Sequence, residues 1–403
     1  MIPGEGSPQV LPLRDITEVV AALEHAGVSE VGLKVMDKRA LFRVVRVTGL
    51  GIRAVNILKQ ELISRGGDVA VSEDLFQWMK ENGGCLLMGT LSQFERLLPR
   101  LKAPDLGLRD LAVSVEAALR NYDDPTPPSP PGLPLAHAPL LMGILNVTPD
   151  SFSDDGLHMD LEATVRFGLD MVAQGPALVD VGGESTRPGA EPVFELEELK
   201  RVMPVIKALA GALPGRVSID TYKARVAAEA LAAGAYMVND ISALRMDREM
   251  VAVVRDADCP VVLMHMLGKP KTMQKDPVYR DLIEDLYTFF LERLSWAVDK
   301  GLKEENLLID PGIGFGKTTA HNLEIMRNLE AFRSLGRPIV VGASRKRFLG
   351  ELLGIDEPRE RDIATAATTT MAVLAGAHIV RVHQVGPNRE AAGIARAVLG
   401  TLT

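Results

Sequence analysis

A pattern that occurs eight times from Ala138 onward constrains the fold more than any other feature of the sequence: a short apolar segment that ends in polar or charged residues. The eight segments are 140–145, 177–181, 217–220, 236–240, 261–266, 307–310, 339–342 and 378–383. Stretches with helical periodicity, such as 161–173, 195–209, 224–232 and 282–298, separate them. Such alternation indicates parallel strands with helices outside.

This part of the chain is roughly 265 residues long, close to the ~250 residues of an eight-stranded β/α barrel. We therefore predict an α/β fold with a (β/α)8 TIM barrel over about 138–403. A doubly wound open sheet is the alternative. It is weakened because no glycine-rich dinucleotide turn follows the first segment.

The region before the barrel also alternates between strand-like and helix-like segments. Strands are expected at 30–36, 41–47, 68–72 and 84–89, and helices at 52–65, 75–80, 91–101 and 108–120. These predict a small α/β module over 1–124, whose role the sequence does not indicate. The proline-dense segment 125–137 cannot form a helix or a central strand, and is predicted to be a semi-rigid linker.

Composition narrows the classes of function. The net charge of -8 argues against a general nucleic-acid surface. An anionic substrate would therefore need a local cluster of Lys and Arg. We expect no membrane-spanning segment and no signal peptide, because no apolar run is long enough and the N-terminus lacks a basic region. The two cysteines lie in apolar runs, as in a reducing compartment, so a cytoplasmic location is expected.

The carboxyl ends of the predicted strands carry the candidate chemistry, because in a β/α barrel these ends meet at one mouth. Arg381 and His383 are two residues apart and face the same way in a strand. With Lys346 and Arg187 they could hold a phosphorylated group. Two carboxylates and an amide at other ends match the donor and acceptor edge of a nitrogen heterocycle; these are Asp220, Asn239 and Asp310. Asn146 is a polar amide at the end of the first strand, as a ligand site on such a barrel needs.

The segment 310–318 looks like a phosphate-binding P-loop, but Pro311 stands where that motif needs its first glycine. We reject a nucleotide-hydrolysing function and expect Lys317 to be a solvated loop lysine. Phe315 either lines an apolar wall of the site or plugs the barrel rim. His265 is expected to be a core histidine with its hydrogen bonds satisfied.

Eight ordered motifs make the region from about 138 to the C-terminus resemble the dihydropteroate synthase family. They cover 142–154, 180–190, 218–221, 238–241, 263–266, 310–317, 344–346 and 381–383. The resemblance implies an enzyme that condenses 6-hydroxymethyl-7,8-dihydropterin diphosphate with 4-aminobenzoate. The products are 7,8-dihydropteroate and pyrophosphate, on the route to folate. It also implies a requirement for Mg²⁺, competition by sulfonamides and a homodimer.

The resemblance also implies residue roles. Asn146 matches the metal-linked asparagine. Asp220, Asn239, Asp310 and Lys346 match the pterin pocket, with Met264 against the ring, and Arg381 and His383 match the diphosphate-holding set. The substrate-binding set further includes Thr186, Arg187, Pro188, Phe315, Gly342 and Ser344. Asp220, Lys346, Arg381 and His383 are the expected catalytic residues. The N-terminal module is not part of the minimal family. A pterin-binding methyltransferase and a non-catalytic pterin-binding protein are the alternatives.

Overall fold

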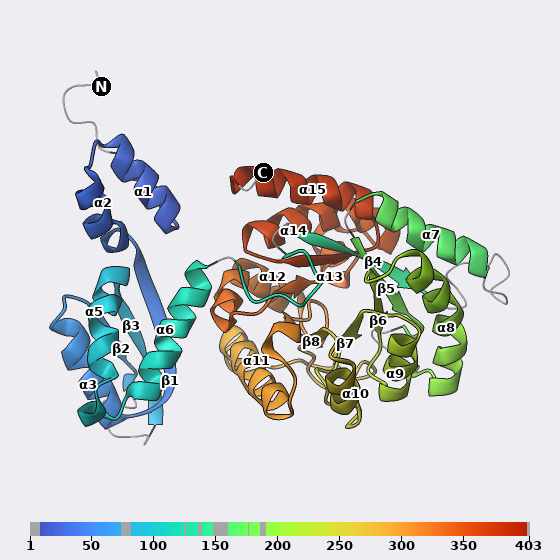
Figure 1. Ribbon diagram of the computed structural model, residues 1–403, viewed down its shortest axis with the longest axis horizontal. Coiled ribbons are helices and arrows are strands. Elements are labelled where there is room, and N and C mark those ends of the chain that lie inside the picture. The colour runs from blue at the N-terminus through green and yellow to red at the C-terminus, as the bar shows by residue number, and fades with distance from the viewer. Residues whose placement is uncertain are drawn as a thin grey trace. The chain divides into compact units, whose positions relative to one another are not determined.

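The structure is a computed structural model that describes residues 9–73, 82–124, 126–135, 139–147, 160–175, 177–185 and 191–400 (Figure 1). The chain divides into two compact units, Met1–Asp123 and Asp124–Thr403. The predicted helical piece 75–80 lies outside the described residues.

The first unit is a three-stranded antiparallel sheet with helices. Its strands are β1 (Phe42–Gly51), β2 (Asp68–Val71) and β3 (Asn82–Thr90), in the order β1-β3-β2. Because β3 runs antiparallel to both neighbours, β1 and β2 are parallel and are joined by a helical crossover. The helices are α1 (Ile16–His25), α2 (Glu30–Met36), α3 (Ile52–Ile63), α5 (Leu91–Leu101) and α6 (Arg109–Asp123).

The strand predicted at 30–36 is wrong, because this segment forms helix α2. The apolar residues Val31, Leu33 and Val35 alternate with others, which favours a strand. The Oγ atom of Ser29, however, accepts a hydrogen bond from the Gly32 backbone N–H and caps a helix. None of the residues of α2 is buried, so the alternation does not reflect a buried strand face.

The second unit is an eight-stranded parallel barrel, as predicted. The strand order is β10-β11-β4-β5-β6-β7-β8-β9, and a parallel bridge between Ile309 and Ile339 joins the two ends. This closure excludes the open-sheet alternative. The strands are β4 (Leu140–Asn146), β5 (Ala177–Gly182), β6 (Val217–Asp220), β7 (Met237–Asp240), β8 (Val261–Met264), β9 (Leu307–Asp310), β10 (Val340–Val341) and β11 (Ile379–Val382).

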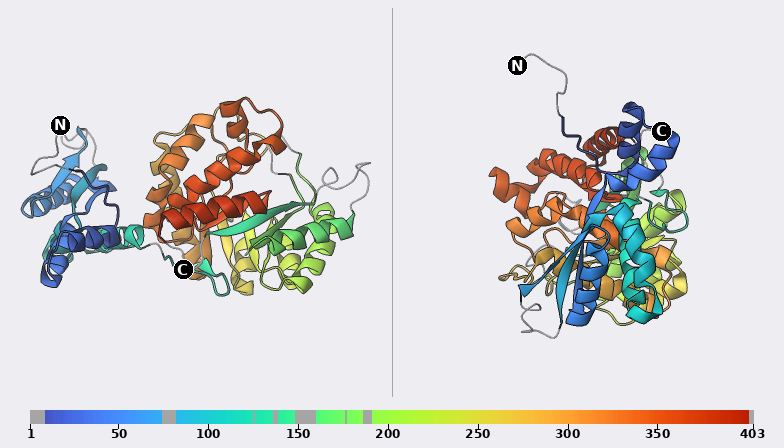
Figure 2. Two further views of the ribbon diagram at one scale, coloured as in Figure 1. Left: turned by 90° about the horizontal axis from the view of Figure 1, so that it is seen from above. Right: turned by 90° about the vertical axis from the view of Figure 1, so that its left-hand side faces the viewer.

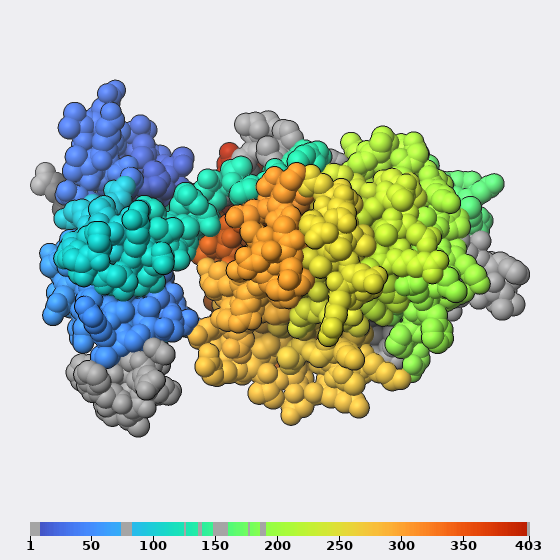
Figure 3. All heavy atoms as spheres, turned by 60° about the horizontal axis from the view of Figure 1, so that its bottom comes forward, coloured from blue at the N-terminus to red at the C-terminus, as the bar shows by residue number. Residues whose placement is uncertain are grey.

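The helices of the second unit lie outside its strands, as the views of Figure 2 show. The helices are α7 (Leu161–Ala173), α8 (Glu195–Ala212), α9 (Ala224–Ala232), α10 (Met250–Ala257), α11 (Leu282–Asp299), α12 (Thr319–Arg327), α13 (Arg347–Leu353), α14 (Asp362–Leu374) and α15 (Val385–Val398). On the face seen in Figure 3, the yellow-green to orange part of the chain, which includes α9, α10 and α11, forms a continuous surface.

The last part of the proline-rich segment packs with the barrel. Leu133 and Leu135 are buried in one cluster with residues of seven barrel strands, among them Met142 and Met237. The Tyr236 hydroxyl donates a hydrogen bond to the Pro131 carbonyl at 2.6 Å. This segment therefore contributes to the barrel core as well as separating two units of the chain. Across the described residues, we find no helix with the length and apolar character needed to cross a membrane.

Candidate active site

The parallel register places the candidate residues of β4 to β7 side by side at the carboxyl ends of these strands. Asn146 pairs with Gly182, Gly182 pairs with Asp220, and Asp220 pairs with Asn239. A side chain on Gly182 would meet the Asp220 carboxylate at about 3.5 Å. Gly182 therefore lies between Asn146 and Asp220 and directly beside the Asp220 carboxylate.

A buried ion network lies at the centre of this mouth. Arg381 Nε donates to Asp180 Oδ2 at 2.6 Å, and Arg381 Nη2 donates to Asp220 Oδ2 at 2.7 Å. Asn239 Nδ2 donates to the same Asp180 oxygen at 2.9 Å. Asp180 lies in the predicted strand 177–181 but is not among the predicted site residues. The signal for its importance was its place after a buried segment and directly before Val181-Gly-Gly-Glu184.

Burial perturbs the acids of this mouth. Desolvation raises the pKa of Asp220 to about 7, although the nearby Arg381 cation opposes the shift. Desolvation also raises the pKa of Asp310, against a hydrogen bond from the Gly312 backbone N–H to Asp310 Oδ1 at 2.7 Å. Acids with raised pKa values beside buried cations are typical of functional sites.

The loop after β9 and the segment after β10 meet on the other side of the mouth. The Phe315 ring is buried in an apolar cluster with Met264, Met266 and Ile241. Lys346 Nζ lies 4.0 Å from the centroid of that ring, which is a cation–π distance. Phe315 therefore joins an apolar wall to the charged residues.

Ser344 and His383 form a further pair. Ser344 Oγ lies 2.9 Å from His383 Nδ1 and accepts a hydrogen bond from the His383 backbone N–H at 3.2 Å. Gly342 lies close by: a Cβ atom there would stand 3.8 Å from the Arg381 Cβ and 4.0 Å from Asp310 Oδ2. These contacts bring the residues after β10 and β11 into the same mouth.

The prediction that Lys317 is a solvated loop lysine is wrong. Lys317 is only 3% exposed, and its Nζ lies 2.9 Å from His265 Nδ1. Loop 312–317 turns inward, because its three glycines adopt positive φ, and carries the lysine into the protein. The expectation for His265 is confirmed: it is a buried histidine whose ring nitrogen has a partner.

A second buried charge cluster lies between β5 and β6. Lys223 forms ion pairs with Glu184 and with Glu198, whose side chain is 1% exposed. The Tyr222 hydroxyl donates to Glu184 Oε1 at 3.0 Å. This cluster could not be predicted from the sequence, because no local pattern links Glu198 on α8 with Lys223. The predicted residues Thr186, Arg187 and Pro188 lie outside the described residues.

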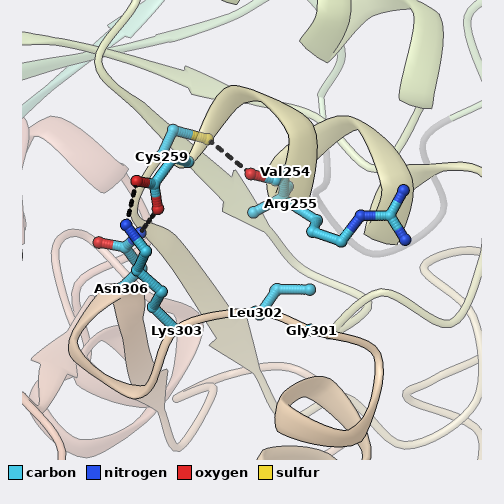
Figure 4. A pocket seen from close by; sticks show the side chains of 8 residues that line it. Val254, Arg255, Cys259, Gly301, Leu302, Lys303 and Asn306 are labelled. Carbon is cyan, nitrogen blue, oxygen red and sulfur yellow. Dashed lines mark hydrogen bonds and ion pairs between the residues drawn. The ribbon is translucent and has the colours of Figure 1, made fainter.

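A small cavity lies at the opposite, amino-terminal end of the barrel strands (Figure 4). It measures about 230 Å³ and is lined by residues that include Cys259 and Asn306, which precede β8 and β9. Asn306 Nδ2 donates to Asp258 Oδ1 at 2.9 Å. None of the predicted site residues lines this cavity. In β/α barrels this end serves stability, whereas catalysis occurs at the carboxyl ends.

Comparison with known proteins assigns the barrel to a family. The sequence profile described as "Pterin binding enzyme" matches residues 142–383, more than half of the chain. The chain belongs to this family of pterin-binding barrel enzymes. Its relatives named below carry the name dihydropteroate synthase, alone or as half of a bifunctional name.

Dihydropteroate synthase of Escherichia coli is 43% identical over 267 residues, covering 66% of this chain and 94% of that protein. A probable bifunctional folylpolyglutamate synthase/dihydropteroate synthase of Haloferax volcanii is 38% identical over 397 residues. That match covers 95% of this chain, including the N-terminal module, but the chain spans only 46% of that relative. A solved structure of the Xanthomonas albilineans synthase with 4-aminobenzoic acid has a TM-score of 0.61 at 44% identity, covering 66% of this chain and 94% of that one.

Proposed function

We propose that the barrel condenses 6-hydroxymethyl-7,8-dihydropterin diphosphate with 4-aminobenzoate and releases 7,8-dihydropteroate and pyrophosphate in folate biosynthesis. The observation that carries this proposal is the buried mouth in which Arg381 bridges Asp180 and Asp220, with the family match around it. The relatives' names and the 4-aminobenzoic acid in the Xanthomonas structure support the choice of substrates.

The pterin ring is held by the buried polar residues of β6, β7 and β9. Asp220, Asn239 and Asp310 offer the acceptors and donors that match the edge of a nitrogen heterocycle. Asn239 and Asp310 are each 5% exposed, so a ring lacking the matching groups would leave buried polar atoms unpaired. Met264 supplies apolar surface for the face of the ring.

The leaving diphosphate is held by cations at the end of the barrel nearest β10 and β11. Lys346 and His383 stabilise the charge that develops on the leaving group. Arg381 acts mainly through the carboxylates: two of its guanidinium nitrogens are already bound to Asp180 and Asp220. Loss of pyrophosphate leaves a cation on the methylene carbon, which the ring and the nearby carboxylates stabilise. The aniline nitrogen of 4-aminobenzoate then attacks this carbon, and the new C–N bond is completed when this nitrogen loses one proton to the released pyrophosphate or to water.

Mg²⁺ is proposed as the cofactor, with Asn146 as its protein ligand. Among the described residues, no cluster of three or more His, Cys, Asp or Glu side chains could hold a metal. Mg²⁺ is commonly bound by few protein oxygens together with substrate phosphates and water, and one amide oxygen at the mouth fits that mode. The metal would neutralise charge on the diphosphate.

The 4-aminobenzoate site is proposed beside Phe315 and Ser344, with Gly342 leaving room at the strand end. Phe315 supplies apolar surface for the aromatic ring of the substrate, and Ser344 is fixed by His383. Thr186, Arg187 and Pro188 belong to this site by the resemblance. Sulfonamides, which compete with 4-aminobenzoate in this family, are expected to inhibit.

We propose a homodimer that uses an apolar surface of α14 and α15. Ile363 is 87% exposed and Ile394 is 65% exposed, and Met371 and Val398 are also exposed on these two helices. α14 and α15 pack against each other, so these side chains belong to adjoining helices. An Ile394→Glu variant should shift the molar mass measured by light scattering from that of a dimer to that of a monomer. A wild-type mass of one chain would contradict the homodimer.

The enzyme is proposed to act in the cytoplasm, where its buried free thiols Cys85 and Cys259 remain reduced.

The activity is tested by mass spectrometry of reactions that contain the pterin diphosphate and Mg²⁺, with and without 4-aminobenzoate. We expect dihydropteroate only when both substrates are present. Folded protein that yields no dihydropteroate would refute the synthase function, and methyl transfer to a corrinoid would identify a methyltransferase instead.

A further inference from the structure

Lys317 is a buried lysine that the proposed reaction does not use, and burial lowers the pKa of its ammonium group to about 7. Its Nζ donates to the Phe315 carbonyl at 3.1 Å and to the His265 carbonyl at 3.4 Å, and lies 2.9 Å from His265 Nδ1. Burial lowers the pKa of His265 to about 2, so its ring is neutral and Nδ1 accepts the hydrogen bond. The lysine therefore joins the loop after β9 to the end of β8.

The loop 312–317 is shaped to close around this lysine. Gly312, Gly314 and Gly316 all have positive φ, between 64° and 81°. A Cβ atom on Gly312 would stand 2.0 Å from the His265 carbonyl oxygen, and one on Gly316 would stand 2.8 Å from the Leu267 carbonyl oxygen. The loop backbone thus lies directly against residues 265–267, and only glycine permits that approach.

The same loop carries groups that belong to the active site. The Phe315 ring lies in the apolar wall with Met264 and beneath Lys346 Nζ. The Gly312 backbone N–H donates to the Asp310 carboxylate. Lys317 accordingly holds the backbone carbonyl of Phe315. The carbon of this carbonyl is bonded to the Cα atom that carries the ring.

We propose that Lys317 is a positioning residue: by binding the Phe315 carbonyl and His265, it fixes the Phe315 ring against Lys346 and so shapes the 4-aminobenzoate side of the site. This inference rests on the proposed function for its kinetic consequence. Its structural part does not depend on that function, because it concerns contacts within the chain alone.

The kinetic test compares Lys317→Met, Phe315→Ala and the double variant in the full-length protein. We expect Lys317→Met to raise KM for 4-aminobenzoate about tenfold or more while kcat changes less than about threefold, as for lost uniform binding. Because the lysine acts through the ring, the double variant should be no worse than Phe315→Ala alone. Lys207→Met, which changes an exposed lysine on α8, is the matched control and should leave KM unchanged.

Independent, additive effects of the two substitutions, or an equal fall in kcat with unchanged KM, would overturn the proposal. Lys317→Gln keeps one amide donor and should give a smaller rise in KM; it replaces the methionine variant if that variant does not fold. Hydrogen exchange of the amides in 312–317, measured without substrates, should become faster than in the wild type. Unchanged exchange would also refute the inference, and this readout stands even if the wild-type protein has no synthase activity.

Discussion

Replacing Asp220 with asparagine removes one buried ionisable group at nearly constant volume. Burial raises the pKa of Asp220 from 3.8 to about 7. At pH values between these two, the carboxyl group of Asp220 keeps its proton in the folded protein but has lost it in the unfolded chain. The free energy of unfolding therefore falls as the pH rises through this window. Each pH unit corresponds to about 1.4 kcal/mol, so the stability of Asp220→Asn relative to the wild type should improve by about 3 kcal/mol from about pH 5 to about pH 8.

Unfolding of the barrel can be followed by the fluorescence of Trp296, which lies on α11, in a Trp78→Phe background that removes the other tryptophan of the chain. Urea titrations at the two pH values give the relative stabilities of the wild type and variant. Asp256→Asn, on the exposed surface of α10, is the matched control and should show no such pH dependence. At pH 8 the variant should have lost at least about 100-fold in kcat/KM, because a charge beside the reacting group is missing. A relative stability that does not change with pH would refute the reasoning.

Three further perturbations test other parts of the structure. Arg381→Met leaves the Asp180 and Asp220 carboxylates without their cation. Urea unfolding should therefore show a loss of about 3–5 kcal/mol in stability at pH 8 and a smaller loss at pH 5. The kcat/KM of this variant should fall well over tenfold, because a desolvated charge contact contributes about 2–4 kcal/mol. Deletion of residues 1–124 should leave an active, folded barrel, and an insoluble or inactive fragment would show that the module is integral. Deletion of residues 1–137 also removes Leu133 and Leu135 from the barrel core; with about 2–5 kcal/mol for each buried leucine, this fragment should melt at a clearly lower temperature than the first, and equal melting temperatures would contradict the packing.

The barrel could be predicted because its strands are marked twice, by a short apolar run and by the polar residue that ends it. The predicted segment 217–220 coincides with β6, and 307–310 coincides with β9. The carboxyl ends of parallel strands meet in space, so the order of strand ends also indicated which side chains gather. Asp220 and Asn239 are direct neighbours for this reason.

Contacts that depend on tertiary structure could not be predicted in the same way. His265, one partner of Lys317, follows β8 and is 52 residues away in the sequence, and a glycine-rich loop by itself suggests exposure. Arg381 has a cationic side chain suited to a phosphate, yet its neighbours across the barrel are two carboxylates, which no local pattern reveals. The apolar alternation in α2 indicated a strand, because a sequence pattern does not show whether its apolar face is covered.

The proposed function requires that one mouth of the barrel binds both the pterin and its diphosphate. A crystal structure of the protein with Mg²⁺ and a non-hydrolysable analogue of the pterin diphosphate tests this claim directly. We predict the ring between Asp220, Asn239 and Asp310, and the phosphates beside Lys346 and His383. An analogue bound elsewhere, such as in the cavity at the other end of the strands, would contradict it.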